Sequence, residues 1–297
     1  MTLNNPKDPR DSGVGVPRAL APDLLAGKRA WITGGGTGLG RAMALRFAEL
    51  GAGVALSARR EGPLTDTARE ISEAGGRASW ATCDVRDPEA VHSAFRQLLE
   101  DGEIDILVNN AAGNFLCASE DLSPNGFAAV VDIVLNGTFH CTQAAARHWI
   151  GAGRHGAVLN IAATYAWTGS SFVLPSACAK AGVVALTRSL AVEWARHRIR
   201  LNAIAPGPIP TREAFARLLP SDEAAESRRR RIPAGRFGTP EELAEMAAFL
   251  VSDAAEWMRG EVVTLDGGEW LYGAGEFNEL LELPAEARET LMKKRKR

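Results

Sequence analysis

From residue 29 onward, short β-type runs alternate with helical stretches, and this alternation leaves few folds open to the chain. The β-type runs are AWIT, GVALS, ASWATCDV, DILVNNA, AVLNIAA, RLNAIAP and EVVTLDGG. Helical patterns follow over 38–50, 63–74, 88–100, 124–150 and 175–196, and near 211–219 and 240–252. Strands that alternate with helices form right-handed βαβ units, and apolar runs such as DILV fit strands buried on both faces. We therefore expect an α/β fold: a single Rossmann-like, doubly wound parallel sheet of about seven strands with helices on both faces.

The composition fits one domain with two loose ends. Residues 1–26 are rich in Pro, Gly and charge and predict a flexible arm, residues 27–285 form the domain, and 286–297 form a basic tail ending in KKRKR. With 34 basic and 36 acidic residues, the chain has no broad attraction for nucleic acid or membranes, and no run of 18 apolar residues predicts a membrane span. The four cysteines lack metal-ligand spacing, so we expect no metal, no disulfide and a reducing, cytoplasmic location.

A glycine-rich loop follows the first strand and opens the first helix. Its sequence TGGGTGLG spans 33–40. Glycines let the backbone approach a pyrophosphate, and the helix N-terminus stabilises the negative charge. We expect a dinucleotide here rather than a merely structural turn. The candidate contacts are Thr33, Gly34, Gly35, Gly36, Thr37, Gly38, Leu39 and Gly40.

The end of the second strand predicts which dinucleotide binds. An acid at this place binds the ribose 2′-hydroxyl of NAD, whereas a basic group accommodates the 2′-phosphate of NADP. The strand ends LSARR, with no acid before Glu61. We therefore expect NADP(H), with Arg59 as the main contact and Arg60 as a second one, although both arginines could simply be solvated.

These motifs resemble those of the short-chain dehydrogenase/reductase family. The matching segments are TGGGTGLG, CDV at 83–85, NNAAG at 109–113, PGPI at 206–209, GRFGTPEELA at 235–244 and DGG at 266–268. The resemblance implies that Asp84 and Val85 flank the adenine and that the NNAAG segment lines the cofactor. It also implies that the PGPI turn lies against the nicotinamide and that the protein is a dimer or tetramer. The implied cofactor residues are Asp84, Val85, Asn109, Asn110, Ala111, Gly113, Lys180, Pro206, Gly207, Pro208 and Ile209.

The chain departs from this family where most members carry their proton-transfer groups. Alignment on Lys180 places Ser176 at the usual tyrosine position and Ala163 at the usual serine position, and Val134 replaces the usual asparagine. Three missing polar groups indicate either a dead site or another reaction. Tyr165 follows the fifth strand near the rim where open parallel sheets bind ligands, so it favours another reaction, although taken alone it could be a packing residue.

A closer resemblance explains the displaced tyrosine. The segments NNAAGNFL, LSPNGF, VVDIVLNGTFH, TYAWTGSSFVLPSACAKAG, IAPGPIPTREAFARL and GEFNEL resemble the NADPH-dependent 2,4-dienoyl-CoA reductases, especially the mitochondrial type. This resemblance implies a catalytic set of Tyr165, Asn114, Lys180 and Ser176, and substrate contacts at Arg59, Arg86, Phe115, Ser123 and Arg217. It also implies an acyl-CoA substrate, a role in fatty-acid β-oxidation and a homotetramer.

The implied reaction needs hydrogen-bond donors aimed at an oxygen. Hydride addition at Cδ of the dienoyl thioester moves negative charge to the thioester oxygen, which Tyr165 and Asn114 can stabilise. Protonation at Cα then gives the trans-3-enoyl-CoA. Other readings stay open: a trans-2-enoyl-thioester reductase, a ketone or sugar reductase, or a non-catalytic NADP-binding sensor. The run Arg228–Arg231 could be a solvated face or could face an anionic ligand.

Overall fold

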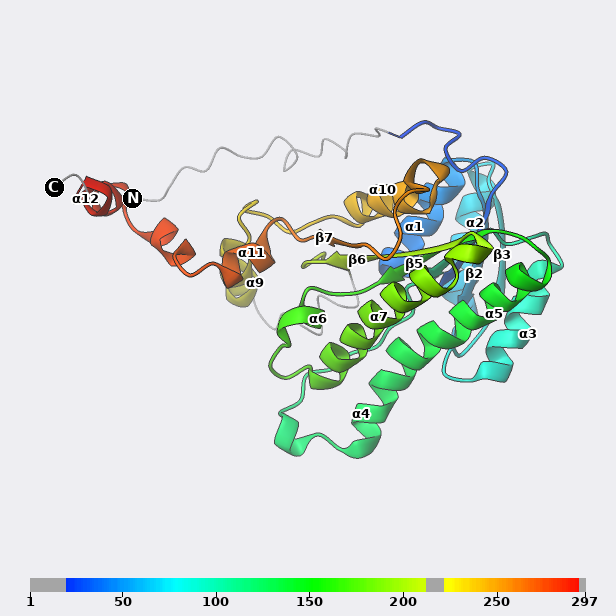
Figure 1. Cartoon of the computed structure of the whole chain (residues 1–297), viewed down its shortest axis with the longest axis horizontal. Helices are drawn as coiled ribbons and strands as arrows, with labels where there is room; N and C mark the ends of the chain where they lie inside the picture. Colours follow the sequence, from blue (N-terminus) through cyan, green and yellow to red (C-terminus); the bar gives the residue numbers. More distant parts are fainter. Residues whose placement is uncertain (1–19, 212–221, 294–297) are drawn as a thin grey trace.

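The computed structural model describes residues 20–211 and 222–293, and its centre is one parallel sheet (Figure 1). The strands are β1 (Arg29–Thr33), β2 (Gly53–Ala58), β3 (Arg77–Thr82), β4 (Ile106–Asn109), β5 (Gly156–Ile161), β6 (Ile199–Pro206) and β7 (Val262–Leu265). Their order is β3-β2-β1-β4-β5-β6-β7, with every neighbouring pair parallel. The strand order reverses between β1 and β4, because β2 and β3 are added on one side of β1 and β4 to β7 on the other, and open α/β sheets bind ligands at such a point. The expected doubly wound, seven-stranded sheet is confirmed.

Helices cover both faces of the sheet, as Figure 1 shows. The major ones are α1 (Gly38–Glu49), α2 (Glu61–Glu73), α3 (Pro88–Leu99), α4 (Pro124–Val131), α5 (Gly137–Gly151), α7 (Leu174–Glu193), α9 (Asp222–Arg230), α10 (Pro240–Val251) and α12 (Ala285–Lys293). Shorter helices are α6 (Tyr165–Thr168) and α11 (Glu269–Ala274). The helix expected near 211–219 lies almost entirely outside the described residues.

Two apolar cores hold these layers together. On one face, α1, α2 and α10 bury side chains such as Phe47, Ile71 and Leu243 against the sheet. On the other face, α3 and α5 pack around Trp31 and Trp149, which are fully buried. Each indole N–H is satisfied, by Ser57 Oγ at 2.8 Å and by the Ile104 carbonyl at 2.6 Å. Buried polar atoms of this kind stabilise a core only when they are paired.

One long helix differs from the expected pattern. The stretch expected as a single helix over 124–150 is helical throughout, but Asp132–Asn136 form a π-helical turn between α4 and α5. A π turn adds a residue to the helical turn and rotates the side chains that follow it. Val134, at the centre of this turn, is buried against Val183 of α7.

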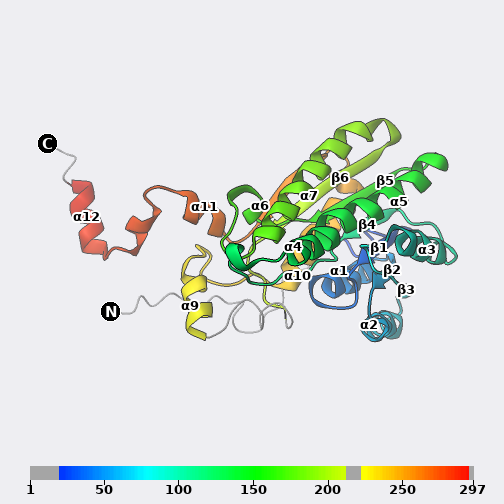
Figure 2. The same cartoon turned by 90° about the horizontal axis from the view of Figure 1, so that it is seen from below.

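The two ends of the described chain behave differently. Leu25 is fully buried and its N–H donates to the Leu50 carbonyl at 2.9 Å, so the packed core begins before residue 27. At the other end, α12 has no buried residue and runs away from the sheet (Figure 2). The expected domain limit at 285 coincides with the start of this helix and stays a prediction. No helix within residues 20–211 and 222–293 is long and apolar enough to cross a bilayer.

Candidate active site

A cleft of about 1370 Å³ opens at the carboxyl ends of the parallel strands. Its walls come from the glycine loop, the ends of β2 and β4, the segment after β5, helix α7 and the PGPI turn. Arg41, Arg59 and Arg60 line it beside the glycine loop and β2, and we call this part the nucleotide end. Tyr165, Ser176 and Glu269 line it after β5 and at α7 and α11, and we call this part the substrate end.

The glycine loop has the backbone geometry that a phosphate-binding turn requires. Gly34 and Gly38 have φ angles of 65° and 53°, a region that favours glycine. A Cβ on Gly40 would lie 2.2 Å from the Gly34 carbonyl oxygen, so only glycine allows α1 to start this close to the loop. Of the eight expected contacts, Gly34, Gly36, Thr37, Gly38 and Leu39 line the cleft.

The other three residues of the loop support it from behind. Gly35 packs against Leu56, where a Cβ would lie 2.7 Å from a side-chain carbon. Gly40 forms the close contact just described. Thr33 is buried, and its hydroxyl oxygen accepts the backbone N–H groups of Asn110 and Ala111, each at 3.0 Å. Thr33 therefore fixes the next loop of the cleft rather than lining it.

The NNAAG segment divides into an inner and an outer part. Asn109 is buried, and its amide donates to Thr142 and Asn160, each at 2.8 Å. It therefore links β4 to α5 and β5 and does not line the cleft. Asn110, Ala111 and Gly113 line the cleft, as do Val85 and the four residues of the PGPI turn. Asn110 also donates through its side chain to the Thr33 carbonyl at 3.0 Å.

The nucleotide end is basic at the place that distinguishes the two cofactors. β2 ends at Ala58, and Arg59 and Arg60 follow on the cleft wall. Asp84 also lines the cleft, but Arg86 holds its carboxylate, with Nη2 to Oδ2 at 2.6 Å. This hydrogen bond is the main reason that the pKa of Asp84 is lowered, and the charge of Arg59 acts in the same direction.

At the substrate end, Tyr165 and Ser176 are joined directly. Tyr165 is the first residue of α6, and Ser176 lies in the first turn of α7, with their oxygens 3.0 Å apart. Burial raises the pKa of the Tyr165 phenol, while the bond to Ser176 and the charge of Arg228 act in the opposite direction. A phenol whose pKa is raised stays protonated near neutral pH and can donate a hydrogen bond.

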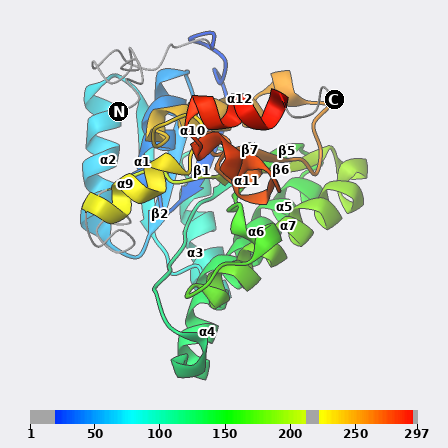
Figure 3. The ribbon, with the colours of Figure 1, turned by 90° about the vertical axis from the view of Figure 1, so that its left-hand side faces the viewer.

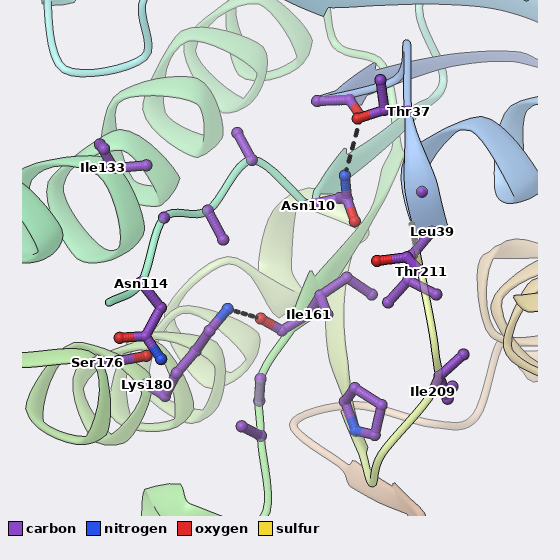
Figure 4. Close-up of a pocket in the computed structure, with 18 of the residues that line it drawn as sticks. Thr37, Leu39, Asn110, Asn114, Ile133, Ile161, Ser176, Lys180, Ile209 and Thr211 are labelled. Atoms are coloured by element: carbon purple, nitrogen blue, oxygen red, sulfur yellow. Dashed lines mark hydrogen bonds between the residues drawn. The ribbon is translucent and has the colours of Figure 1, made fainter. Parts of the chain in front are cut away.

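Lys180 lies one helical turn after Ser176 and points toward β5. Its ammonium donates to the carbonyl oxygen of Ile161 (Figure 4). Burial lowers the pKa of Lys180 to about 8. Among the described residues, no hydrogen bond joins Lys180 to Tyr165, so its contact with the ligand ribose stays a prediction.

Asn114 faces the same space, close to Ser176 and Lys180 in Figure 4. Its side-chain oxygen accepts the backbone N–H of Phe115 at 2.9 Å. This bond orients the amide so that its nitrogen remains available as a donor. The four residues expected to be catalytic, Tyr165, Asn114, Ser176 and Lys180, thus all line one end of the cleft.

The usual ketone-reducing groups are absent from the positions where they would act. Ala163 is buried at the carboxyl end of β5, and Val134 belongs to an apolar cluster between α4 and α7. Neither side chain can accept or donate a proton. The cleft can therefore offer hydrogen bonds to a developing oxyanion through Tyr165 and Asn114, but lacks the family's usual proton relay.

The expected substrate contacts are brought together only in part. Arg59 lines the cleft, whereas Arg86 is turned onto Asp84 and does not. Ser123 caps α4 by accepting the N–H of Gly126 at 3.0 Å, and Phe115 packs beside that glycine, outside the cleft. Arg217 lies outside the described residues. The roles of these side chains in substrate binding remain predictions.

Two charged residues line the substrate end although neither was assigned to the site from the sequence. Arg228, on α9, and Glu269, the first residue of α11, both line the substrate end. The signal for Arg228 was the basic run 228–231, whose members separate in the structure: Arg229 and Arg230 pair with Glu226, and only Arg228 of the run reaches the cleft. Glu269 follows the DGG motif and had no signal of its own.

Comparisons with known proteins identify relatives of this chain. A family model described as enoyl-(acyl carrier protein) reductase matches residues 34–269. A probable 2,4-dienoyl-CoA reductase of Bacillus subtilis, described as (2E)-enoyl-CoA-producing, is 49% identical over 82% of this chain and 97% of its own. A probable 2,4-dienoyl-CoA reductase of Caenorhabditis elegans, described as (3E)-enoyl-CoA-producing, is 44% identical over 86% and 84%.

Solved structures share the fold. A gluconate 5-dehydrogenase from Burkholderia cenocepacia J2315, in complex with NADP and tartrate, is 34% identical, with a TM-score of 0.79 over 84% of this chain and 97% of that one.

Proposed function

The chain belongs to the short-chain dehydrogenase/reductase family of oxidoreductases, and we propose that it uses NADPH to reduce 2,4-dienoyl-CoA thioesters. The observation that carries the proposal is the pairing of Tyr165 with Ser176 at the substrate end, in a cleft whose usual tyrosine, serine and asparagine positions hold other residues. Relatives that carry the dienoyl-CoA reductase name match most of the chain, which supports the same substrate class.

The residues at the nucleotide end fit NADP(H). A 2′-phosphate needs a cation, and Arg59 and Arg60 stand directly after β2, where a carboxylate would repel it. Gly36 and Gly38 leave room for the pyrophosphate at the N-terminus of α1. NADP bound in a neighbouring structure of the same fold supports the assignment.

The chain's own residues would act on the thioester oxygen. When bound, the nicotinamide supplies a hydride. The Tyr165 hydroxyl and the Asn114 amide nitrogen would donate to the thioester oxygen, where negative charge collects once a C–H bond forms at Cδ and the π electrons of the dienoyl group shift toward the carbonyl. Ser176 orients the phenol through the 3.0 Å contact. Lys180, buried beneath them, supports the substrate end and the ribose.

The position of protonation decides the product. Protonation at Cα of the dienolate leaves a trans-3-enoyl-CoA, and protonation at Cγ leaves a trans-2-enoyl-CoA. We propose Cα, with the proton coming from Tyr165 or from water, since Tyr165 would stand beside the thioester oxygen and therefore nearer Cα than Cγ. The name of the Bacillus relative makes the trans-2 product the second candidate.

One experiment separates the candidate functions. The purified protein is mixed with NADPH and a 2,4-dienoyl-CoA, a trans-2-enoyl-CoA or a ketone, and the oxidation of NADPH is followed by absorbance. We expect turnover with the dienoyl-CoA alone, and a trans-3-enoyl-CoA on product analysis. Turnover of the mono-unsaturated thioester at an equal rate would identify an enoyl reductase, and NADPH binding without turnover of any substrate would identify a sensor.

A further inference from the structure

The substrate end contains an ion pair that the proposed mechanism does not use. Arg228 Nε lies 3.4 Å from Glu269 Oε1, and both side chains line the cleft. The Arg228 side chain is 43% exposed, so a ligand in the cleft can reach it. Within the described residues, no hydrogen bond uses its two terminal nitrogens. They remain available as donors to a ligand.

Glu269 is fixed in place by its surroundings. Its side chain is only 15% exposed and belongs to the first turn of α11. Asp266 caps this helix by accepting the N–H groups of Gly268 and Trp270, each at 2.8 Å. Because its backbone is fixed by the cap and its side chain is mostly buried, the Glu269 carboxylate loses little conformational entropy when it binds a partner. It can therefore orient the Arg228 guanidinium.

The same helix is tied to the helix that carries Tyr165. Trp270 of α11 packs against Trp167 of α6, with ring centroids 5.1 Å apart. Tyr165 lies two residues before Trp167, and Glu269 lies one residue before Trp270. The indole contact thus sets the distance between the phenol and the ion pair. Helices α6, α9 and α11 gather at one end of the sheet in Figure 2 and Figure 3, as this connection requires.

From this geometry we propose that Arg228 is a further catalytic residue, which donates to the thioester oxygen beside Tyr165, with Glu269 as its positioning residue. The inference rests on the proposed function. A cation next to an oxygen that gains negative charge stabilises the transition state more than the ground state, so it raises kcat rather than only tightening binding. The charge of Arg228 acts to lower the pKa of the Tyr165 phenol, against the larger effect of burial, so the guanidinium lies near enough to influence the oxygen beside which the thioester oxygen would bind.

Lys180 is less suited to this role. Its ammonium is committed to the Ile161 carbonyl, and burial disfavours its charged form. Arg41, Arg59 and Arg60 line the nucleotide end of the cleft. Arg228 is thus the arginine that the described residues place at the substrate end.

The test compares neighbouring arginines on one helix. Arg228→Met keeps most of the side-chain volume and removes the charge. Arg229→Met is the matched control, since Arg229 lies on the same helix, pairs with Glu226 and does not line the cleft. With NADPH and a 2,4-dienoyl-CoA, we expect Arg228→Met to lower kcat by about 10-fold or more, with KM changing less than about 3-fold. Arg229→Met should stay within about twofold, and Arg228→Lys should recover part of the loss.

Glu269→Gln tests the positioning role. It leaves Arg228 charged but weakens the contact that orients it. We expect an intermediate loss of kcat in this variant and no further loss when Glu269→Gln is added to Arg228→Met, because both changes act through the same guanidinium.

A second measurement needs no substrate. The chain has two tyrosines, so Tyr272→Phe leaves Tyr165 as the sole phenol, and its ionisation can be followed by tyrosinate absorbance. In this background Arg228→Met should move the Tyr165 titration to higher pH, and Arg229→Met should not. Circular dichroism across the titrated range verifies that both variants remain folded.

A kcat for Arg228→Met within twofold of the parent, a loss confined to KM, or an unchanged titration would overturn the proposal. If the unmodified protein does not reduce the dienoyl-CoA, the proposed function fails. The titration would still show whether the charge of Arg228 influences the Tyr165 phenol oxygen.

Discussion

Replacing Tyr165 by Phe removes one oxygen from the substrate end and changes little else. The phenol oxygen contacts Ser176 Oγ at 3.0 Å, and Ser176 is only 2% exposed, so the substitution leaves a buried hydroxyl without this partner. Such a loss lowers the free energy of unfolding by about 1 kcal/mol. For a chain of 297 residues, that lowers the melting temperature by roughly 2–4 °C. NADPH affinity should be unchanged, because Tyr165 lies at the other end of the cleft from Arg59.

The effect on turnover should be far larger than the effect on stability. Removal of one donor to a developing oxyanion costs roughly 10²-fold or more in kcat, or about 2.7 kcal/mol or more. Asn114→Ala should give a loss of similar size. Because both groups would donate to one oxygen, the double variant should lose less than the product of the two single losses.

The assay is steady-state turnover of a 2,4-dienoyl-CoA with NADPH, together with thermal unfolding and NADPH titration of each variant. Tyr272→Phe is the matched control, because the hydroxyl of Tyr272 donates to Glu282 away from the cleft. It should turn over at the parental rate. A Tyr165→Phe protein that is folded, binds NADPH and works within about 3-fold of the parent would refute the mechanism and make Tyr165 a packing residue.

Three further changes test the nucleotide end, the buried lysine and the glycine loop. Arg59→Ala should weaken NADPH binding by about 10-fold or more and leave NADH nearly unaffected, because only NADPH carries the 2′-phosphate; equal losses in fluorescence titrations would contradict the assignment. Burial lowers the pKa of Lys180 to about 8 from its ordinary 10.5, so between these values the unfolded chain binds more protons than the folded one. The cost of burying the charge is therefore fully present below pH 8, and the stability of the parent relative to Lys180→Met should rise by roughly 3 kcal/mol at most between pH 8 and 10.5 in urea unfolding; a constant difference would contradict the shift. Gly40→Ala places a Cβ 2.2 Å from the Gly34 carbonyl oxygen and should cost about 1–3 kcal/mol and weaken NADPH binding, whereas Gly62→Ala, with nothing within 4 Å, should be harmless in the same melting and titration experiments.

The sequence alone determined the sheet, the glycine loop between β1 and α1, and the absence of a tyrosine four residues before Lys180. These features depend on local patterns. Apolar runs such as DILV report a strand buried on both faces, and the spacing of the glycines reports a turn that only glycine can form. The absence of the family's usual asparagine at position 134 and serine at position 163 could also be predicted, because it depends only on aligning the sequence at Lys180 and at the segment DIVLNGTF.

Tertiary structure decided which charged groups reach the cleft. Arg86 was a reasonable candidate by position, but Asp84 two residues earlier holds it, and Lys180 is directed to Ile161. Arg228 belonged to a run of four arginines that could be solvated or could face an anionic ligand, and in the structure it lines the cleft, where it pairs with Glu269. The sequence cannot fix these outcomes, since a long charged side chain has many rotamers of similar energy. The choice among them depends on partners that lie far away in the chain and close only in the folded protein.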